Sequence, residues 1–129
     1  MIKVVFIEDD RMNRRVVRDM LDVAGVEMDE AEDAETGLAL IDSESFDLVL
    51  LDLRMPGMDG LSAIRHIRAR GDAKAAIPII VVTADTAADL RQQCLDAGAD
   101  AVVFKPVAMD VLFETMGRLL ARGDDDDLI

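Results

Sequence analysis

The chain has 129 residues, a length that suits one domain with an ordinary hydrophobic core. Its formal net charge of −13 repels nucleic acid phosphates and anionic membranes, which argues against direct DNA binding and against a membrane partner. The single cysteine, Cys94, excludes an intramolecular disulfide and a cysteine-rich metal site, and we expect it to be a small core residue on a helix.

The first segment of the chain predicts a strand that ends in acid. Residues 3–7, KVVFI, form a short apolar run that continues directly into Glu8 and Asp9. The sequence shows no signal-peptide pattern before this strand and no apolar run long enough to cross a membrane. We therefore expect a cytoplasmic protein.

An amphipathic helix follows and ends at Gly25. Asp10 and Asn13 are expected to serve its N-terminus. Its apolar residues recur at helical spacing and are expected to face the core: Met12, Val16, Val17, Met20, Val23 and Ala24. Its arginines would occupy the other sides, as a solvated face or as a surface for a partner: Arg11, Arg14, Arg15 and Arg18.

The next segments place a buried strand near the middle of the chain. Residues 26–31 predict a weak strand, interrupted by charge, at or near a sheet edge, and residues 34–41 predict a short helix. Residues 48–51 form a continuous apolar run, which suits a strand covered on both faces. Asp52 ends this strand, and the turn sequence MPG follows at residues 55–57.

The second half of the chain repeats the alternation of strand and helix. Thr83 and Lys105 directly follow two further apolar strands. The predicted elements are strands at residues 79–82 and 101–104, helices at residues 61–67, 87–97 and 111–120, and a polar loop at residues 71–76. The first of these helices is expected to start at Asp59-Gly60 and to turn its basic residues to solvent: Arg65, His66, Arg68 and Arg70.

Five strands that alternate with five helices predict an α/β fold, a doubly wound (βα)5 parallel sheet with right-handed crossovers and helices on both faces. We place this single domain at residues 1–122. Residues 123–129 include four consecutive aspartates and are too polar to pack, so we expect an acidic, disordered tail there.

The residues that end the strands would meet at one edge of a parallel sheet, where α/β proteins bind ligands. They are Glu8, Asp9, Asp52, Thr83 and Lys105. Taken alone, Asp52 could merely end a strand or cap a turn. Three clustered carboxylates, however, repel one another unless a cation lies among them, and their oxygens suit Mg²⁺, which completes its coordination with water and phosphate oxygens. A carboxylate, a metal, a hydroxyl and an ammonium form a sufficient set for phosphoryl transfer.

Four motifs in order on this βα repeat make the chain resemble the receiver domain of a two-component response regulator, similar to the CheY-like single-domain regulators. The resemblance covers residues 2–121 and rests on the acidic pair Glu8-Asp9 with Asn13 downstream, and on LLDLRMPGMDG, VVTAD and FKP. It implies a flavodoxin-like sheet with the strand order 2-1-3-4-5.

The resemblance also implies a magnesium site and a phosphoacceptor. Asp52 would take a phosphoryl group from a phosphohistidine of a sensor histidine kinase or a histidine phosphotransfer protein. Asp9 and Asp52 would bind Mg²⁺ directly, with the backbone carbonyl of Arg54 as a third protein ligand and Glu8 acting through water.

Three further groups would surround the phosphoryl oxygens, as the resemblance implies. The hydroxyl of Thr83, the backbone N–H of Ala84 and the ammonium of Lys105 would each contact them. In this family the Lys-Pro bond, here Lys105-Pro106, is usually cis.

The chain departs from the commonest receiver pattern at Val102, where receivers often carry Tyr or Phe whose ring turns inward as the threonine moves. The sequence therefore does not predict coupling of Thr83 to output through a rotating aromatic. Phe104 would share a strand face with Val102. Glu8 in place of Asp is a common variant that should retain metal binding.

Arg54 and Asp85 lie two residues after Asp52 and Thr83, positions that flank the path of attacking water in receivers. One hypothesis is that they form an ion pair across the mouth of the site and slow hydrolysis. The alternative is two solvated surface charges of little consequence.

The predicted function is a phosphorylation-dependent switch without turnover of a free substrate. With no effector domain attached, it would act on a downstream protein through the face made by the fourth helix, the fifth strand and the fifth helix. Two alternatives stay open: an unphosphorylated pseudo-receiver that serves only as an interaction module, and a small phosphohydrolase of the haloacid-dehalogenase type. The second fits poorly, since its nucleophile belongs on the first strand and Arg54 occupies the place of its second acid.

Overall fold

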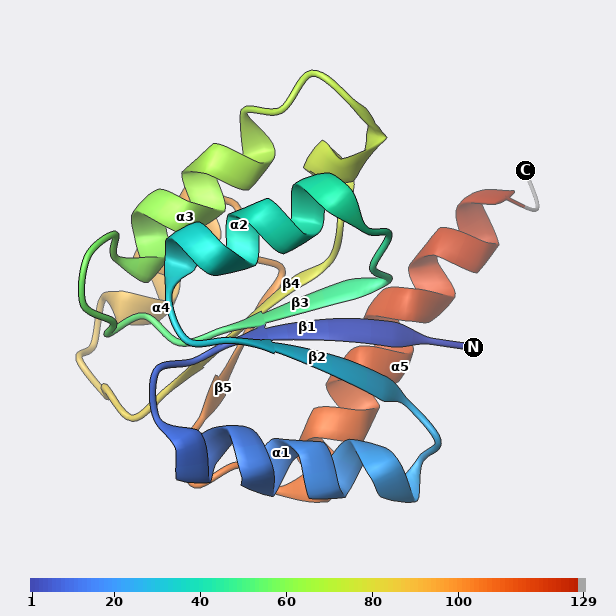
Figure 1. The fold of residues 1–129 in the computed structure, drawn as a ribbon, viewed down its shortest axis with the longest axis horizontal. Coiled ribbons are helices and arrows are strands. Elements are labelled where there is room, and N and C mark those ends of the chain that lie inside the picture. The colour runs from blue at the N-terminus through green and yellow to red at the C-terminus, as the bar shows by residue number, and fades with distance from the viewer. Residues whose placement is uncertain (128–129) are drawn as a thin grey trace.

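A five-stranded parallel sheet with the order β2-β1-β3-β4-β5 forms the middle layer of the protein (Figure 1). The structure is a computed structural model that describes the backbone of residues 1–127 and the side chains of residues 1–122. The strands are β1 (Lys3–Ile7), β2 (Glu27–Ala31), β3 (Leu48–Leu51), β4 (Ile79–Thr83) and β5 (Ala101–Phe104). The predicted fold class and strand order are confirmed, with β2 at the edge as its charged sequence indicated.

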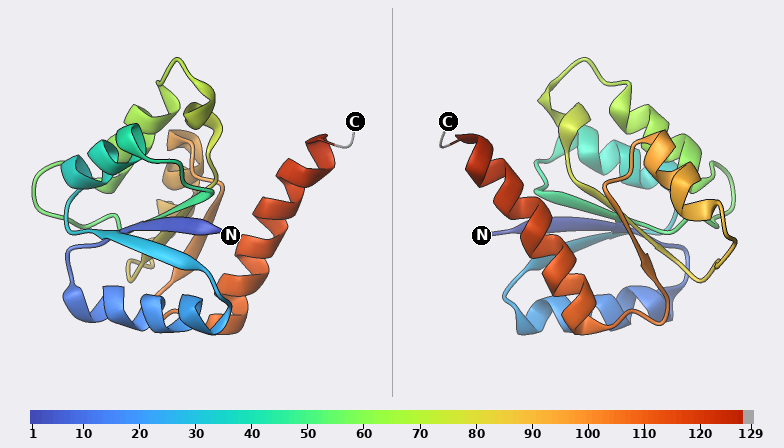
Figure 2. Two further views of the ribbon diagram at one scale, coloured as in Figure 1. Left: turned by 45° about the vertical axis from the view of Figure 1, so that its right-hand side comes forward. Right: turned by 180° about the vertical axis from the view of Figure 1, so that it is seen from behind.

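Helices cover both faces of this sheet, with α1 and α5 on one side and α2, α3 and α4 on the other (Figures 1 and 2). Their bounds are α1 (Arg11–Val23), α2 (Ala34–Ser43), α3 (Gly60–Arg68), α4 (Leu90–Ala97) and α5 (Met109–Asp127), with a short 3₁₀ helix, η1 (Ala73–Ala76), before β4. No helix among residues 1–127 combines the length and apolar character needed to cross a membrane.

Each strand divides its side chains between two separate hydrophobic cores, because successive residues of a strand point to opposite faces. In β1, Val5 and Ile7 pack in the core under α2, α3 and α4, whereas Val4 and Phe6 pack in the core under α1 and α5. Cys94 is buried in the first of these cores, as predicted. The sheet is therefore covered on both faces, which explains why its central strands read as continuous apolar runs.

The strand register brings the polar strand ends together at one edge. Ile7 of β1 lies opposite Leu51 of β3, and the N–H of Asp52 donates to the carbonyl of Ile7 at 2.9 Å. On the other side of the sheet, the N–H of Lys105 donates to the carbonyl of Thr83 at 2.8 Å. The residues that follow β1, β3, β4 and β5 are thus fixed by the sheet itself.

Aspartates begin three of the helices that leave this edge. The carboxylate of Asp10 accepts hydrogen bonds from the N–H groups of Met12 and Asn13 at the start of α1. Asp33 and Asp59 cap α2 and α3 in the same way. The predicted roles of Asp10 and Asp59 at helix starts are confirmed.

Helix α1 turns a narrower apolar face to the core than its sequence pattern predicts. Val17 and Leu21 are buried, but Met12, Val16 and Val23 are 67%, 41% and 75% exposed, so their placement in the core was wrong. An α-helix rotates by about 100° per residue, which carries these three side chains at least that far round the helix from Val17. They are left on the solvent side of α1.

Arg68 was expected to face solvent and does not. Its guanidinium donates to the carbonyls of Gly98, Ala75 and Ile77 and to the carboxylate of Asp100. The long side chain folds back from the end of α3 over the starts of β4 and β5, a placement that residue spacing does not reveal. Arg65 and His66 are exposed as predicted.

Two helix bounds differ from those predicted. Helix α4 begins at Leu90 rather than at residue 87, because the carboxylate of Asp85 accepts the N–H of Ala87 and holds an irregular turn before it. Helix α5 continues to Asp127, past the boundary expected at residue 122. Residues 128 and 129 of the expected tail lie outside the described residues.

Candidate functional site

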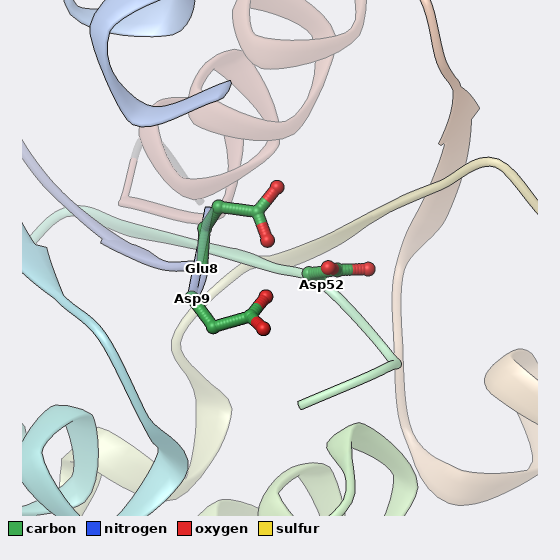
Figure 3. Close-up of side chains that lie close together, drawn as sticks. All are labelled: Glu8, Asp9 and Asp52. Atoms are coloured by element: carbon green, nitrogen blue, oxygen red, sulfur yellow. The ribbon is translucent and has the colours of Figure 1, made fainter. Parts of the chain in front are cut away.

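Three carboxylates from two strand ends converge at the edge of the sheet. Glu8 and Asp9 follow β1, Asp52 follows β3, and one oxygen from each lies within 4.8 Å of the others. Glu8 and Asp52 are buried, whereas Asp9 is exposed. Figure 3 shows the carboxyl groups of Glu8 and Asp9 on the side of the chain that faces Asp52. The sequence prediction of an acidic cluster at this edge is confirmed.

Lys105 brings positive charge to this cluster from the end of β5. Its ammonium lies 2.7 Å from Oε1 of Glu8 and 3.4 Å from Oδ2 of Asp52. Burial acts to lower the pKa of Lys105, but the hydrogen bond to Glu8 and the charge of Asp52 outweigh it, so the pKa is raised. Lys105 therefore stays an ammonium at neutral pH.

The surroundings of Glu8 oppose the ionisation of its carboxyl group. Burial first, and then the neighbouring Asp52 carboxyl, raise the pKa of Glu8 to about 7, although Lys105 acts in the opposite direction. Its Oε2 is buried and has no hydrogen-bond partner among the described residues. An unpaired buried oxygen of this kind is costly unless a proton, a water or a cation supplies the missing contact.

This cluster fits a hard divalent cation. The ligand atoms that it offers are carboxylate oxygens of the buried Glu8 and Asp52 and of the exposed Asp9. Mg²⁺ typically binds one or two carboxylates in proteins and keeps several water ligands. The buried Oε2 of Glu8 needs a partner that a cation or its water could supply. Glu8, Asp9 and Asp52 are therefore the residues that could hold the metal.

A cleft of about 400 Å³ opens beside Asp52. It is lined by Asp52, Arg54, Thr83, Ala84, Asp85, Thr86 and Lys105. The hydroxyl of Thr83 accepts the N–H of Asp85 at 3.1 Å, which orients it at the end of β4. Every residue that the sequence analysis assigned to phosphoryl contacts thus lies in one cleft.

Arg54 and Asp85 form an ion pair across this cleft, with 2.9 Å between Nη2 and Oδ2. The backbone N–H of Ala87 and the Arg54 guanidinium lower the pKa of the Asp85 carboxyl. The backbone N–H of Arg54 lies 3.4 Å from Oδ1 of Asp52. The ion pair of the first hypothesis is present, and its effect on hydrolysis stays a prediction.

The loop after Asp52 is tied to α2 by a residue that the sequence did not reveal. The Oε1 atom of Glu35 accepts the N–H of Met58 at 3.3 Å. Gly57 has a φ of +82° beside this contact, a conformation that favours glycine. No sequence spacing predicted this link, since Glu35 and Met58 belong to different βα units.

Val102 and Phe104 lie on β5 next to the site. Val102 is partly buried against the core under α3 and α4, whereas Phe104 is 44% exposed. The Lys105-Pro106 bond that follows is cis, as the resemblance implied.

Comparisons with known proteins agree with this geometry. The family model of the response regulator receiver domain matches residues 4–116. Response regulator MprA of Mycolicibacterium vanbaalenii is 38% identical over 98% of this chain and 53% of its own length. Sensor histidine kinase RcsC of Escherichia coli is 34% identical over 88% of this chain, which spans only 12% of that kinase. The chain thus spans about half of one relative and a small part of the other.

Solved structures share the same architecture. The chemotaxis response regulator CheY4 of Vibrio cholerae superposes with a TM-score of 0.83 at 30% identity, over 92% of this chain and 98% of that one. The receiver domain of a Pseudomonas aeruginosa sensor histidine kinase superposes with a TM-score of 0.84 at 29% identity, over 92% and 97% of the two chains. That structure holds a magnesium ion coordinated in its active-site cleft.

Proposed function

Since this chain belongs to the response regulator receiver family, we propose that it is a switch in which Asp52 accepts a phosphoryl group from a phosphohistidine. The donor is a sensor histidine kinase or a histidine phosphotransfer protein. The observation that carries the proposal is the place of Asp52, whose carboxylate lines the cleft with Thr83 and Ala84 and lies 3.4 Å from the ammonium of Lys105.

In the proposed transfer, an Asp52 oxygen attacks the phosphorus and the P–N bond of the donor breaks. The electron pair of that bond stays on the donor imidazole, and Asp52 becomes an acyl phosphate. The Lys105 ammonium, the Thr83 hydroxyl and the Ala84 N–H contact the phosphoryl oxygens, where negative charge must be held in place.

The acidic cluster is proposed to hold Mg²⁺ during this transfer. Asp9 and Asp52 would bind the ion directly, with the backbone carbonyl of Arg54, and Glu8 would act through a bound water. When bound, the ion supplies positive charge to the oxygens of the transferred group. The support is the convergence of the three carboxylates and the unpartnered Oε2 of Glu8.

The output is proposed to be a contact with a downstream protein through α4, β5 and α5. Three large apolar side chains are exposed on this part of the molecule: Phe104, Met109 and Val111, at 44%, 42% and 46%. A protein partner that covered these side chains would remove their apolar surface from water, which favours association. The net charge of −13 supports a protein partner rather than DNA, and we place the protein in the cytoplasm with its phosphodonor.

The position of Asp52 separates this proposal from a haloacid-dehalogenase-type phosphohydrolase. Asp52 follows the third strand of the chain rather than the first, and the residue two positions later is Arg54. A site that binds no metal and accepts no phosphoryl group would instead favour the pseudo-receiver.

The test is the intact mass of the protein after incubation with acetyl phosphate and Mg²⁺. Wild type should gain one phosphoryl group, and Asp52→Asn or wild type with EDTA should gain none. Beryllofluoride, which mimics a bound phosphoryl group, serves as a second probe in case the small donor is not accepted. Failure of both acetyl phosphate labelling and beryllofluoride binding would contradict the proposal.

A further inference from the structure

Arg14 joins the acidic turn after β1 to two other parts of the fold. From the end of the first turn of α1, its Nη1 donates to the backbone carbonyl of Glu8 at 2.7 Å and to that of Asp9 at 3.1 Å. Its Nε lies 3.3 Å from Oε1 of Glu30, on β2. The side chain is only 14% exposed, so this arginine is part of the packed structure rather than of a solvated face.

The two carbonyls that Arg14 contacts belong to the residues that carry two of the three clustered carboxylates. The sheet fixes this turn on one side, where the N–H of Glu8 donates to the carbonyl of Ala31 at 2.9 Å. Asp10 fixes it on the other side as the N-cap of α1. Between these two points, the peptide groups of Glu8 and Asp9 are oriented by the two N–H groups of Arg14 Nη1, while Nε of the same planar guanidinium meets Glu30 and fixes its direction.

We propose that Arg14 is a positioning residue for the acidic pair. By holding both peptide carbonyls, it keeps the Glu8 and Asp9 side chains turned toward Asp52 and so sets the affinity of the cluster for a divalent cation. This inference rests on the proposed function only in its choice of Mg²⁺ as the probe.

Whether loss of Arg14 weakens or tightens Mg²⁺ binding distinguishes a positioning role from an effect of its charge alone. A cation near a metal site repels the metal, so an arginine that acted through its charge alone would weaken Mg²⁺ binding, and its removal would tighten binding. An arginine that orients ligands has the opposite effect, and its loss weakens binding. Replacement by lysine keeps the charge but not the planar fork.

Arg18 offers a matched control on the same helix. Its Nη2 lies 2.9 Å from Oε2 of the same Glu30 and 3.0 Å from the carbonyl of Met28. Arg18 thus shares the salt-bridge partner of Arg14, yet its described hydrogen bonds go to β2 and none goes to the β1–α1 turn. The same substitutions at Arg18 change the same kind of charge without touching the acidic pair.

The experiment is a calorimetric titration of the full chain with Mg²⁺ alone. It compares wild type with Arg14→Lys, Arg14→Ala, Arg18→Lys and Arg18→Ala. Urea unfolding shows that each variant is folded. Both Arg14 variants should bind Mg²⁺ about tenfold more weakly or worse, the range typical when a residue that supports a metal ligand is removed. Both Arg18 variants should stay within about twofold of wild type. Unchanged binding in Arg14→Lys with tighter binding in Arg14→Ala would overturn the proposal in favour of a charge effect.

Amide hydrogen exchange of the metal-free protein tests the positioning role of Arg14 without depending on Mg²⁺ binding. The N–H of Glu8, which donates to the carbonyl of Ala31, and the N–H of Met12, which donates to the carboxylate of Asp10, should exchange faster in Arg14→Lys than in Arg18→Lys. If wild type failed to bind Mg²⁺, the proposed function would fail while this comparison still tested Arg14. Equal exchange in the two variants would overturn the positioning role.

Discussion

Lys105 and Glu8 form an ion pair within the sheet edge, with 2.7 Å between Nζ and Oε1, although Glu8 is fully buried and its second oxygen lacks a partner among the described residues. The same ammonium reaches Asp52 at 3.4 Å. One lysine thus faces two carboxylates, and a third, Asp9, lies within reach of both. Three carboxylates thus share one ammonium, and a proton or a cation would offset the excess of negative charge.

The stability of the metal-free protein should depend on the ionisation of Glu8. Its pKa rises from 4.5 to about 7 on folding, so the folded state binds this proton more tightly than the unfolded state does. The resulting stabilisation is fully present below pH 4.5 and is lost as the pH rises through about 7. It should amount to a few kcal/mol, since each pKa unit corresponds to ~1.4 kcal/mol.

Urea unfolding in EDTA tests this directly. Between about pH 5 and about pH 8, wild type should lose more stability than Glu8→Gln, which cannot ionise. Saturating Mg²⁺ should reduce the loss in wild type. The same decline with pH in both proteins would show that Glu8 is not its source.

Removal of the Arg54–Asp85 pair should shorten the life of the phosphorylated state. The two side chains span the cleft beside Asp52, with 2.9 Å between them, where they would hinder an attacking water. Arg54→Ala, Asp85→Ala and the double variant should lose phosphate several-fold faster than wild type, and the double variant should resemble the single ones. Arg54→Ala should change stability by less than about 1 kcal/mol, because exposed ion pairs contribute little. Asp85→Ala should cost about 1 kcal/mol more, because it also removes the acceptor of the Ala87 N–H. A double variant that loses phosphate at the wild-type rate would return both residues to the status of surface charges.

Gly60 should not tolerate a side chain, because α3 begins against the backbone that follows β3. A Cβ there would lie 2.7 Å from Cα of Leu53 and 2.8 Å from the carbonyl oxygen of Asp52. Gly60→Ala should cost about 1–3 kcal/mol in urea unfolding, as overpacking does, and should shift the Asp52 amide resonance. Gly117→Ala on α5 is the control, since a Cβ there meets nothing within 4 Å and a helical alanine should be neutral or stabilising. Equal effects of the two substitutions would contradict the close approach.

Arg68 should be the arginine of α3 on which stability depends. Its guanidinium donates to three carbonyls and to the carboxylate of Asp100, which also accepts the N–H of Ile79 at 2.8 Å. Arg68→Ala would leave several of these acceptors unpaired and should cost about 3 kcal/mol in urea unfolding. Arg65→Ala, an exposed position on the same helix, should stay within about 0.5 kcal/mol of wild type. A small loss in Arg68→Ala would mean that water replaces the guanidinium.

The strand ends were predictable because two simple rules act together on them. An apolar run that stops at a charge marks where a buried strand leaves the sheet, and parallel strands all leave at the same edge. From the sequence alone, these rules predict that Asp52 and Glu8 lie close together. The register of β1 and β3, in which Ile7 lies opposite Leu51, confirms this. The pattern of apolar and charged residues was sufficient because the backbone of the sheet, and not the side-chain conformation, determines where the strand ends lie.

The contacts of long side chains were not predictable in this way. Spacing along a helix fixes where a Cβ points, but an arginine can fold back along the surface and reach a distant carbonyl. Arg14 and Arg68 were both expected on solvated faces, and each instead ties several backbone segments together. The opposite error was made for Met12 and Val23. These apolar residues were expected in the core but are exposed, because only a narrow face of α1 packs against the sheet.

The residue that carries the phosphoryl group can be identified chemically. An acyl phosphate is reduced by borohydride to the alcohol, which converts an aspartyl phosphate to homoserine. After acetyl phosphate and Mg²⁺ treatment, peptide mass spectrometry should find homoserine at Asp52 and intact aspartate at Asp9. Homoserine at Asp9, or a phosphoryl gain that persists in Asp52→Asn, would show that Asp52 is not the phosphoacceptor.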